Sequence, residues 1–600
     1  MSYKSKIRNF CIIAHIDHGK STLADRILEL TGLMDPSKSG SQVLDSMEVE
    51  KEHGITVKAQ TVSAPYKGKD GQDYLLNLID TPGHVDFSYE VSRSLVACEG
   101  ALLLIDATQG IQAQTLSTFY QAVENNLEII PVLNKIDLPN ARVDEILEQI
   151  ENDLGLDPLD AVAVSAKTGE GVKELFEIII ERLHAPKGDT SNQLKALVYD
   201  AYYDMYRGVV VKVRIVEGTL KKGQEILFMN SNSKYTADEV GLMQIIFNSK
   251  PELRAGDVGY ISAQIKSLAD IKIGDTITLA NNPCAVALDG YKEPQAFVFA
   301  GLFPGDGEDF AELDQALQKL KLTDAALRFD KWNSGALGMG FKCGFLGLLH
   351  LEIIRERLEK EHGLYIISTV PSVEYKVTLN KGEAFLIENA TEFPDPSQIK
   401  MVEEPFVKAV IITPNEYMGT ILTLIQNRRG IQKNLIYIDT KRVQIDCELP
   451  LAEIIYDFFD KLKSYSRGYA SFDYEFLEFR HSKVVKMDIL VGGQPVDALA
   501  QMVYAEDVRA RGMGIVKKLR ELIPRHMFQI ALQAAVGANV VARETISAMR
   551  KDVTAKCYGG DISRKRKLLD KQKEGKKKMK SIGSINIPQE AFIEVLKRDE

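Results

Sequence analysis

The 600-residue chain has few cysteines, and they form no metal-binding pattern. The six cysteines, at positions 11, 98, 284, 343, 447 and 557, are scattered, and no CxxC pair occurs. This usage argues against a disulfide framework and a zinc site, and it fits a reducing cytoplasm. The sequence also lacks any run of about 18 apolar residues that would predict a membrane span. The opening MSYKSKIRNF lacks the apolar stretch of a signal peptide, so we expect a cytoplasmic protein.

Negative charge dominates the chain except in one segment near its end. The net charge is −10, yet residues 564–580, RKRKLLDKQKEGKKKMK, hold ten Lys or Arg and only two Asp or Glu. This segment therefore has a net charge of +8, and the rest of the chain has a net charge of −18. Such a basic segment predicts a polyanionic partner. We expect RNA phosphates as that partner; a solvated tail and a surface for anionic membrane lipids are the alternatives. The candidate RNA-binding residues are Arg564, Lys565, Arg566, Lys567, Lys576, Lys577 and Lys578.

A phosphate-binding loop is predicted where an apolar strand meets a helix. Residues 14–21, AHIDHGKS, follow the P-loop pattern GxxxxGK[ST] except that Ala14 replaces the first glycine. Backbone N–H groups of such a loop and the following helix N-terminus point at phosphates, so a small alanine is compatible with the chemistry. Lys20 would contact the β- and γ-phosphates, and the Ser21 hydroxyl would bind Mg²⁺. An ordinary strand-to-helix turn is the alternative. The candidate binding residues here are Asp17, His18, Gly19, Lys20, Ser21 and Thr22.

Two further segments complete the predicted phosphate end of the site. LLNLIDTPGH (75–84) is an apolar strand that ends in the D-x-x-G arrangement. Asp80 would hold Mg²⁺ through a water, and the Gly83 N–H would sense the γ-phosphate. Upstream, EKEHGITVKA (50–59) contains Thr56, whose hydroxyl is a candidate Mg²⁺ ligand; we call residues 47–59 switch I. The expected metal set is therefore Ser21, Thr56 and Asp80.

Guanine is the base that the remaining loops predict. EIIPVLNKID (128–137) ends in N-K-x-D, and the Asp137 carboxylate can accept hydrogen bonds from the guanine N1–H and 2-amino group. Adenine cannot supply these donors, and a mismatch would leave the carboxylate unpaired. AVAVSAKTG (161–169) offers a backbone N–H for the guanine O6. The candidate residues are Asn134, Lys135, Ile136, Asp137, Ser165, Ala166 and Lys167.

His84 is the candidate catalytic residue because it directly follows Gly83. GTPases position the attacking water with a glutamine near this point, and an imidazole can also hydrogen-bond a water. A surface histidine at a helix start is the alternative interpretation.

AHIDHGKST, HGIT, DTPGHVDF, NKID and SAK together resemble the motifs of translational GTPases. His53 stands where that family usually has arginine, which affects only a peripheral switch I contact. GLLHLEIIRERL and TPNEYMGTILTLIQNRRG resemble elongation factor G, but residues 370–403 are too short for the extra domain that elongation factor G carries there. With the distinct C-terminal region, the whole chain resembles the LepA family, also called elongation factor 4.

This resemblance implies a multidomain α/β and α+β protein with six segments. We expect a P-loop GTPase domain at 1–186, a β-barrel at 187–290 and an α+β domain at 291–372. A connector at 373–403 without an inserted domain, a second α+β domain at 404–483 and a basic C-terminal domain at 484–600 follow. Both α+β domains are expected to be split βαβ (ferredoxin-like) folds.

The resemblance also implies a function. We expect a monomeric, Mg²⁺-dependent GTPase that acts on the ribosome, contacts ribosomal RNA and transfer RNA, and remodels transfer RNA position. A monovalent cation near Asp17 and peripheral contact with the cell membrane are further expectations. One rival is a translocase of the elongation factor G type. Another is an assembly or membrane-docking protein that uses GTP only as a binding switch.

The basic segment generates the first testable prediction. Changing Lys565, Lys567, Lys576, Lys577 and Lys578 to Gln should weaken ribosome binding without altering GTP affinity. Each lost phosphate contact should flatten the plot of log K against log[salt] by about 0.7 to 0.9 units. Titration of ribosomes and of anionic vesicles at several salt concentrations provides the measurement. An unchanged slope on ribosomes contradicts the RNA assignment, and weaker vesicle binding alone favours the lipid alternative.

Overall fold

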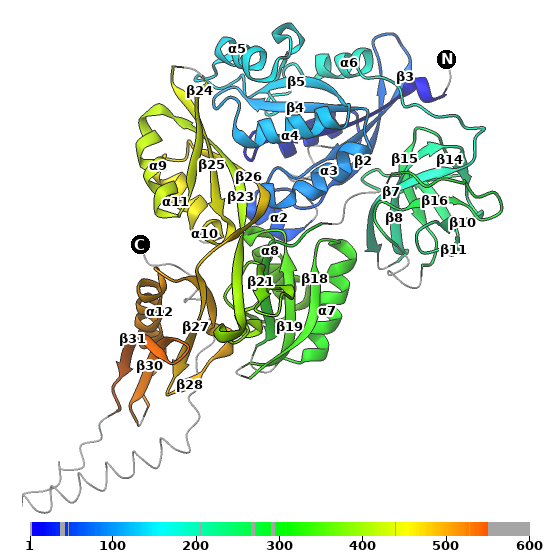
Figure 1. Cartoon of the computed structure of the whole chain (residues 1–600). Coiled ribbons are helices and arrows are strands. Elements are labelled where there is room, and N and C mark those ends of the chain that lie inside the picture. The colour runs from blue at the N-terminus through cyan, green and yellow to red at the C-terminus, as the bar shows by residue number, and fades with distance from the viewer. Residues whose placement is uncertain are drawn as a thin grey trace, which may run out of the picture.

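The computed structural model describes residues 3–35, 43–45, 47–204, 206–265, 271–289, 294–305, 308–335, 337–438, 440–455, 457–526 and 528–549. The basic segment 564–580, with all seven candidate RNA-binding residues, lies outside these ranges. Among the described helices, none combines the length and apolarity that a membrane span needs. Five packed units follow one another along the chain, coloured from blue to orange in Figure 1.

The first unit is an α/β domain around a six-stranded sheet, in the order β2-β3-β1-β4-β5-β6. Only β2 is antiparallel to its neighbour. The strands are β1 (Ile7–Ala14), β2 (Gln60–Lys67), β3 (Asp73–Asp80), β4 (Gly100–Asp106), β5 (Glu128–Asn134) and β6 (Val162–Ala163). Every residue of β1 is buried because helices cover both faces of the sheet. The parallel strands bring their carboxyl ends to one edge, where the predicted loops begin.

Helices of this unit pack in two layers. On one face lie α1 (Lys20–Leu30) and α6 (Val172–Arg182). On the other lie α3 (Ser88–Val96), α4 (Ala113–Glu124) and α5 (Val143–Leu154). Short helices α2 (Glu48–His53), η1 (Tyr3–Lys6), η2 (Val85–Phe87) and η3 (Pro158–Asp160) occupy the connections. Two separate apolar cores therefore hold the sheet in place beneath the loops.

The second unit is an antiparallel, barrel-like β domain. Its main sheet has the order β11-β10-β16-β7-β8-β15-β12-β13, and β9 pairs with β14. The strands are β7 (Lys195–Asp204), β8 (Gly208–Glu217), β9 (Thr219–Lys221), β10 (Glu225–Phe228), β11 (Ser233–Thr236), β12 (Glu239–Leu242), β13 (Asn248–Lys250), β14 (Glu252–Arg254), β15 (Val258–Ser262) and β16 (Thr276–Leu279). A shared core of Val, Leu and Ile fills its interior.

The third unit has the split βαβ topology. Its elements are β17 (Val298–Pro304), α7 (Phe310–Thr323), β18 (Arg328–Ser334), β19 (Gly338–Phe345), α8 (Leu348–His362) and β20 (Ile366–Ser368). The strand order β18-β19-β17-β20 places the first and third strands side by side. Helix α8 lies where this unit meets the first one, so its position bears on the candidate site (Figure 1).

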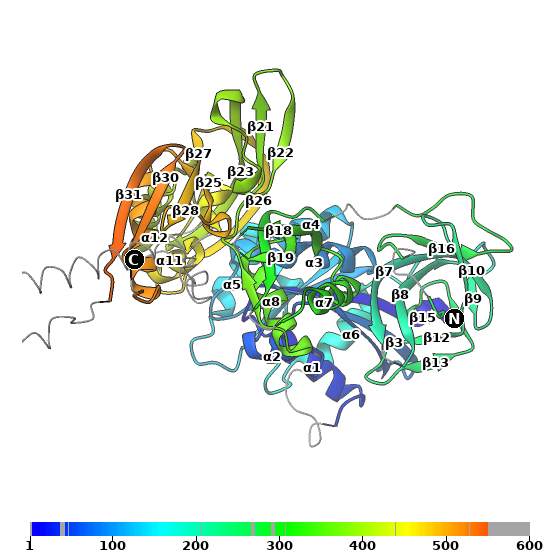
Figure 2. The same ribbon diagram turned by 90° about the horizontal axis from the view of Figure 1, so that it is seen from below.

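The fourth unit repeats this topology and begins earlier than expected. Residues 373–403, expected to be a connector, contain β21 (Tyr375–Leu379) and β22 (Ala384–Ile387), and β21 pairs with the start of β23 (Ile399–Pro414). The alternation in Tyr375–Leu379 suits a strand with one buried face, so this segment extends the sheet. Figure 2 shows the β21–β22 hairpin projecting from the body. The other elements are η5 (Ala390–Glu392), η6 (Pro396–Gln398), η7 (Asn415–Tyr417), α9 (Met418–Asn427), β24 (Ile431–Tyr437), β25 (Arg442–Pro450), α10 (Leu451–Ile454), α11 (Phe458–Tyr465) and β26 (Ser471–His481).

The fifth unit is a small sheet with one helix. It consists of β27 (Val484–Val491), β28 (Gln494–Pro495), η8 (Asp497–Leu499), β29 (Gln501–Tyr504), α12 (Val508–Leu522), β30 (Ile530–Val536) and β31 (Asn539–Ile546). Its core includes Phe303 and Ile367 of the third unit. The fifth unit is therefore anchored to the body by apolar packing.

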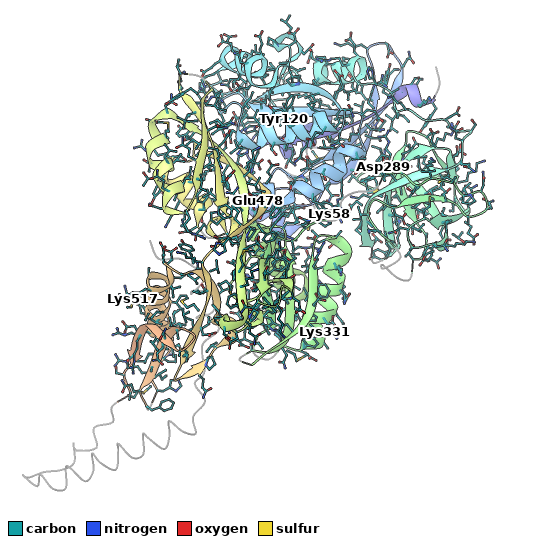
Figure 3. All side chains as sticks on the ribbon, viewed as in Figure 1. Lys58, Tyr120, Asp289, Lys331, Glu478 and Lys517 are labelled. Carbon is teal, nitrogen blue, oxygen red and sulfur yellow. The ribbon has the colours of Figure 1, made fainter. Side chains whose placement is uncertain are left out.

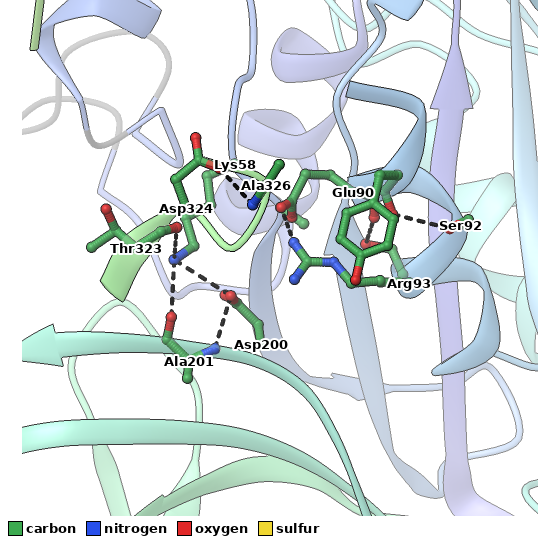
Figure 4. A network of polar contacts seen from close by, with 12 residues as sticks. Lys58, Glu90, Ser92, Arg93, Asp200, Ala201, Thr323, Asp324 and Ala326 are labelled. Carbon is green, nitrogen blue, oxygen red and sulfur yellow. Dashed lines mark hydrogen bonds and ion pairs between the residues drawn. The ribbon is translucent and has the colours of Figure 1, made fainter. Parts of the chain in front are cut away.

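A buried ion cluster joins the first three units (Figure 4). Lys58 of switch I donates to the carbonyl oxygens of Ala201 at 3.3 Å and Thr323 at 3.1 Å. Its ammonium lies 3.4 Å from Asp200 Oδ1, and Lys212 lies 2.9 Å from Asp200 Oδ2. Burial lowers the pKa of Lys58 to about 8, against the opposing effect of Asp200. In Figure 3 Lys58 lies inside this junction, whereas Lys331 lies at the periphery.

Asp200→Asn should destabilise the fold because it leaves two buried ammonium groups without their carboxylate. Breaking a buried ion pair from one side costs about 3 to 5 kcal/mol. Urea unfolding of the variant measures the loss. Adding Lys58→Met should restore part of the stability, since the double variant buries one charge fewer. Lys441→Ala serves as the control because Lys441 is 68% exposed in its pair with Glu145. Equal midpoints for Asp200→Asn and the control would contradict the prediction.

Candidate functional site

The ammonium group of Lys20 is the centre of the phosphate end of the site. Lys20 begins α1, directly after Gly19, whose φ of 88° gives the tight turn that ends the loop. Its Nζ lies 2.8 Å from Asp80 Oδ1, at the carboxyl end of β3, and donates to Thr56 Oγ1 at 2.6 Å. Ser21 Oγ lies 3.4 Å from the same Thr56 hydroxyl. The structure thus brings together Lys20, Ser21, Thr56 and Asp80, from three separate stretches of sequence.

A second carboxylate that sequence reasoning missed lies in this cluster. Thr56 donates its hydroxyl hydrogen to Asp45 Oδ1 at 3.0 Å, and the Asp45 side chain is fully buried. Asp45 Oδ2 and Asp80 Oδ2 have no hydrogen-bond partner among the described residues. Burial raises the pKa of Asp80, although Lys20 opposes that effect. The cluster thus holds two buried carboxylates but only one ammonium group, so a further cation would balance its negative charge.

The residues therefore fit Mg²⁺. Hydroxyl and carboxylate oxygens are the hard donors that this ion prefers, and it keeps several waters when few protein ligands are supplied. Ser21, Thr56 and Asp80 supply such donors around one point now held by the lysine ammonium. The orphaned Asp80 oxygen is the acceptor that a water on the ion would meet.

Asn134 connects the two predicted guanine-binding segments, N-K-x-D (134–137) and S-A-K (165–167), to the phosphate loop. It ends β5, and its Nδ2 donates to the carbonyl oxygen of His18 at 2.9 Å. Its Oδ1 accepts from the Ala166 N–H at 2.9 Å. A Cβ on Gly19 would lie 2.5 Å from Asn134 Nδ2, so only glycine leaves room for this brace. The N-K-x-D and S-A-K segments are thus held at fixed distances from the phosphate end.

Lys135 makes the second link between these loops. Its Nζ donates to the carbonyl oxygen of Asp17 at 2.6 Å and pairs with Asp106 Oδ2 at 2.8 Å. Lys135 and Asp17 both have φ near 65°, in the left-handed region, so both loops turn sharply. Asp106 ends β4 and was not predicted. Its signal is the sequence LLLID, an apolar strand ending in aspartate like the strand before Asp80.

The last two loops meet at Asp137. Ser165 donates its hydroxyl hydrogen to Asp137 Oδ1 at 2.7 Å and accepts from the Thr168 N–H at 3.1 Å. Asp137 is exposed, and Ile136 packs against the core beneath. Arg26 of α1 donates to the carbonyl oxygens of Ala166 at 3.1 Å and Lys167 at 2.7 Å. Thr22 lies exposed on α1. This arrangement leaves the Asp137 carboxylate facing outward, where a base could reach it.

His84 directly precedes η2, with its side chain 17% exposed. Its Nδ1 accepts from the backbone N–H of Asp86 at 3.1 Å, so the neutral ring carries its proton on Nε2. The preceding Gly83 lies against the phosphate loop, because a Cβ there would be 3.1 Å from the carbonyl oxygen of Ala14. His84 is therefore anchored beside the loop through its neighbours on both sides.

His18 supports the phosphate loop from beneath. Its side chain is fully buried, and its Nδ1 lies 3.1 Å from the carbonyl oxygen of Leu104, to which it donates in the neutral form. Burial lowers the pKa of His18 to about 4. The loop therefore rests on a neutral imidazole at physiological pH.

Acid should destabilise this unit through His18. The unfolded chain gains a proton near pH 6.5 and the folded chain near pH 4, so stability falls as pH drops between these values. The linked loss is about 3 kcal/mol when the whole interval is crossed. His18→Asn keeps an N–H for Leu104 but does not titrate, so its stability should fall less steeply with acid. Urea unfolding across this pH range measures the slope, and the exposed His184→Asn is the control. Identical slopes for His18→Asn and the unaltered protein would refute the assignment.

Four family models match separate parts of the chain. Residues 5–185 match the model of the elongation factor Tu GTP binding domain, and residues 208–278 match elongation factor Tu domain 2. Residues 401–490 match the elongation factor G C-terminus, and residues 491–597 match the GTP-binding protein LepA C-terminus.

Full-length relatives are similar to the chain over almost every residue. Elongation factor 4 of Clostridium botulinum (strain Langeland) is 56% identical over 594 residues, which is 99% of each chain. Elongation factor 4 of Borreliella afzelii is 55% identical over 600 residues, all of both chains. A crystal structure of a Thermus thermophilus protein has a TM-score of 0.58 at 18% identity, covering 80% of this chain and 97% of that one. At that identity the likeness concerns the fold alone.

The sequence is more than half identical to full-length elongation factor 4 proteins. It also matches the LepA C-terminus and a GTP-binding domain, whose loops converge in the structure as described. The chain belongs to the elongation factor 4 (LepA) family of translational GTPases.

Proposed function

We propose that this protein hydrolyses GTP to GDP and phosphate when bound to the ribosome, and that it remodels transfer RNA position there. The observation that carries the proposal is the cluster of Lys20, Thr56 and Asp80, which gathers a cation and oxygen donors at the edge from which the guanine loops also extend. The membership of the protein in the elongation factor 4 family supports the ribosome as its partner.

The residues divide the work as follows. The loop N–H groups from Asp17 to Thr22 and the Lys20 ammonium bind the phosphates. Ser21 and Thr56 would hold Mg²⁺, with Asp80 as a further oxygen donor, and the ion would supply charge neutralisation when bound. Asp137 selects guanine, with Asn134, Lys135 and Ile136 bracing the base pocket and Ser165, Ala166 and Lys167 closing it. A monovalent cation beside the exposed Asp17 carboxylate is part of the same proposal.

The negative charge of the γ-phosphate would draw the Lys20 ammonium away from Thr56 and Asp80. Phosphate oxygens of bound GTP would be stronger partners for the ammonium than the Thr56 hydroxyl. Thr56 and Asp80 would then be available as oxygen donors to Mg²⁺. Gly83 follows the γ-phosphate through its N–H, and His84 orients the attacking water. Loss of the γ-phosphate then releases switch I, which would end the tight contact with the ribosome.

Partners outside the GTP site complete the proposal. We assign the basic segment 564–580 to ribosomal RNA phosphates, with anionic membrane lipid as the alternative polyanion. The factor would act as a monomer in the cytoplasm, where ribosomes are found. Turnover of GTP with and without 70S ribosomes tests the GTPase, and toeprinting of transfer RNA position tests the remodelling step.

His84→Ala should separate binding from hydrolysis. GTP affinity should stay nearly unchanged because the side chain takes no part in holding the nucleotide. Ribosome-stimulated turnover should fall by orders of magnitude, as when a water-positioning glutamine is lost. Single-turnover assays with saturating ribosomes measure the rate. A stimulated rate within about threefold of the unaltered protein, below ~1 kcal/mol, removes His84 from the catalytic role.

A further inference from the structure

The N-terminus of α8 has no cap from its own N-cap side chain. That N-cap is Gly347, which has no side chain, so the first N–H groups of this 15-residue helix need another acceptor. Asp86 of the first unit supplies it. Asp86 Oδ2 accepts from the N–H of Leu349 at 3.0 Å and of His350 at 3.4 Å. A carboxylate is also the charge that the positive end of a helix dipole favours.

Gly347 is required here for space. A Cβ on Gly347 would lie 2.2 Å from the carboxyl carbon and both oxygens of Asp86, so any side chain would displace the carboxylate. The φ of Gly347 is −166°, an extended conformation open to every residue. The backbone conformation therefore accepts alanine, and the nearest atoms that its Cβ would displace are those of the Asp86 carboxylate.

The same aspartate holds His84. Its backbone N–H donates to His84 Nδ1 at 3.1 Å, which leaves Nε2 as the ring's donor. Asp86 is 7% exposed and lies in η2, only two residues from the imidazole. Its side chain is bound to α8 and its main chain to His84, so Asp86 links the helix to the imidazole.

Switch I rests on the same helix further along. Val49 and Val57 of switch I, with Phe87 of η2, form one apolar group with Ile353 of α8. His53 Nε2 lies 3.1 Å from Glu356 Oε1, and Lys360 pairs with Glu52. Helix α8 therefore touches switch I and η2. Within η2, Phe87 packs against the helix and Asp86 accepts hydrogen bonds from its N-terminus.

We propose that Asp86 is a positioning residue for hydrolysis, and that the third unit controls the reaction by seating the N-terminus of α8 on it. The inference rests on the proposed role of His84. When α8 is docked, Asp86 is fixed at both ends and the imidazole is held in one tautomer and one orientation. When the third unit shifts, Asp86 loses its contact with α8, and the imidazole is no longer held in one tautomer and one orientation. Hydrolysis then depends on the placement of a domain other than the one that carries the GTP-binding loops.

Variants of Asp86 and Gly347 test this from both sides of the contact. Asp86→Ala and Gly347→Ala should each lower the single-turnover rate on saturating ribosomes by between about tenfold and a hundredfold. GTP affinity and ribosome affinity should change little, since neither residue belongs to those surfaces. Asp86→Asn keeps an oxygen acceptor of nearly equal capping strength and should retain most of the rate. Gly419→Ala is the matched control, because a Cβ there meets nothing within 4 Å.

Combined variants separate positioning from general damage. In a His84→Ala background, adding Asp86→Ala should have no further effect, because the aspartate acts through the imidazole. Asp86→Ala with Gly347→Ala should be no slower than Asp86→Ala alone. A Gly347→Ala rate within about twofold of the Gly419→Ala control overturns the inference, as does an undiminished Asp86→Ala effect without His84. Failure of the unaltered protein to respond to ribosomes would instead overturn the proposed function.

Discussion

A buried charge must be paired, and the phosphate end of this protein depends on how that requirement is met around Lys20. The ammonium holds Asp80 and Thr56, and Thr56 in turn holds Asp45. One cation therefore holds the end of β3 and Thr56 of switch I close to α1. A substrate phosphate and its metal ion carry the charges that can take over these contacts.

Two contacts couple the neighbouring units to the nucleotide-facing segments. Lys58 donates into the second and third units at once, through the carbonyl oxygens of Ala201 and Thr323. Asp86 reaches the third unit at the N-terminus of α8. Both contacts place a charged side chain of the first unit against main-chain groups of another. Backbone groups in helices and strands are fixed within their element, so under the proposed function small changes near the nucleotide would be passed to the neighbouring domains.

Four loops of the candidate site were predictable in position because each follows an apolar strand. The Thr56 loop follows the short helix α2 and was predicted from its GIT sequence upstream of D-x-x-G. The sequences before Ala14, Asp80, Asn134 and Ser165 are strands, and parallel packing brings their carboxyl ends together. Asp45 could not be found this way, since none of the described strands leads into it and its hydrogen bond to the site is accepted from Thr56. Length alone predicts a connector at residues 373–403, whereas the short alternating pattern of β21 forms a strand there. Such a strand is stable only beside β23, which the local sequence does not specify.

By itself, the sequence determined the P-loop, the D-x-x-G, N-K-x-D and S-A-K segments, and the family to which they belong. Those features are local patterns whose chemistry requires certain residue types at fixed spacing. Only the tertiary structure decided that Asp86 caps α8, that Gly347 must leave room for it, and that Lys58 is shared among three units. These contacts join residues more than 140 positions apart. Their partners are main-chain groups, which every residue carries and which no sequence pattern therefore marks.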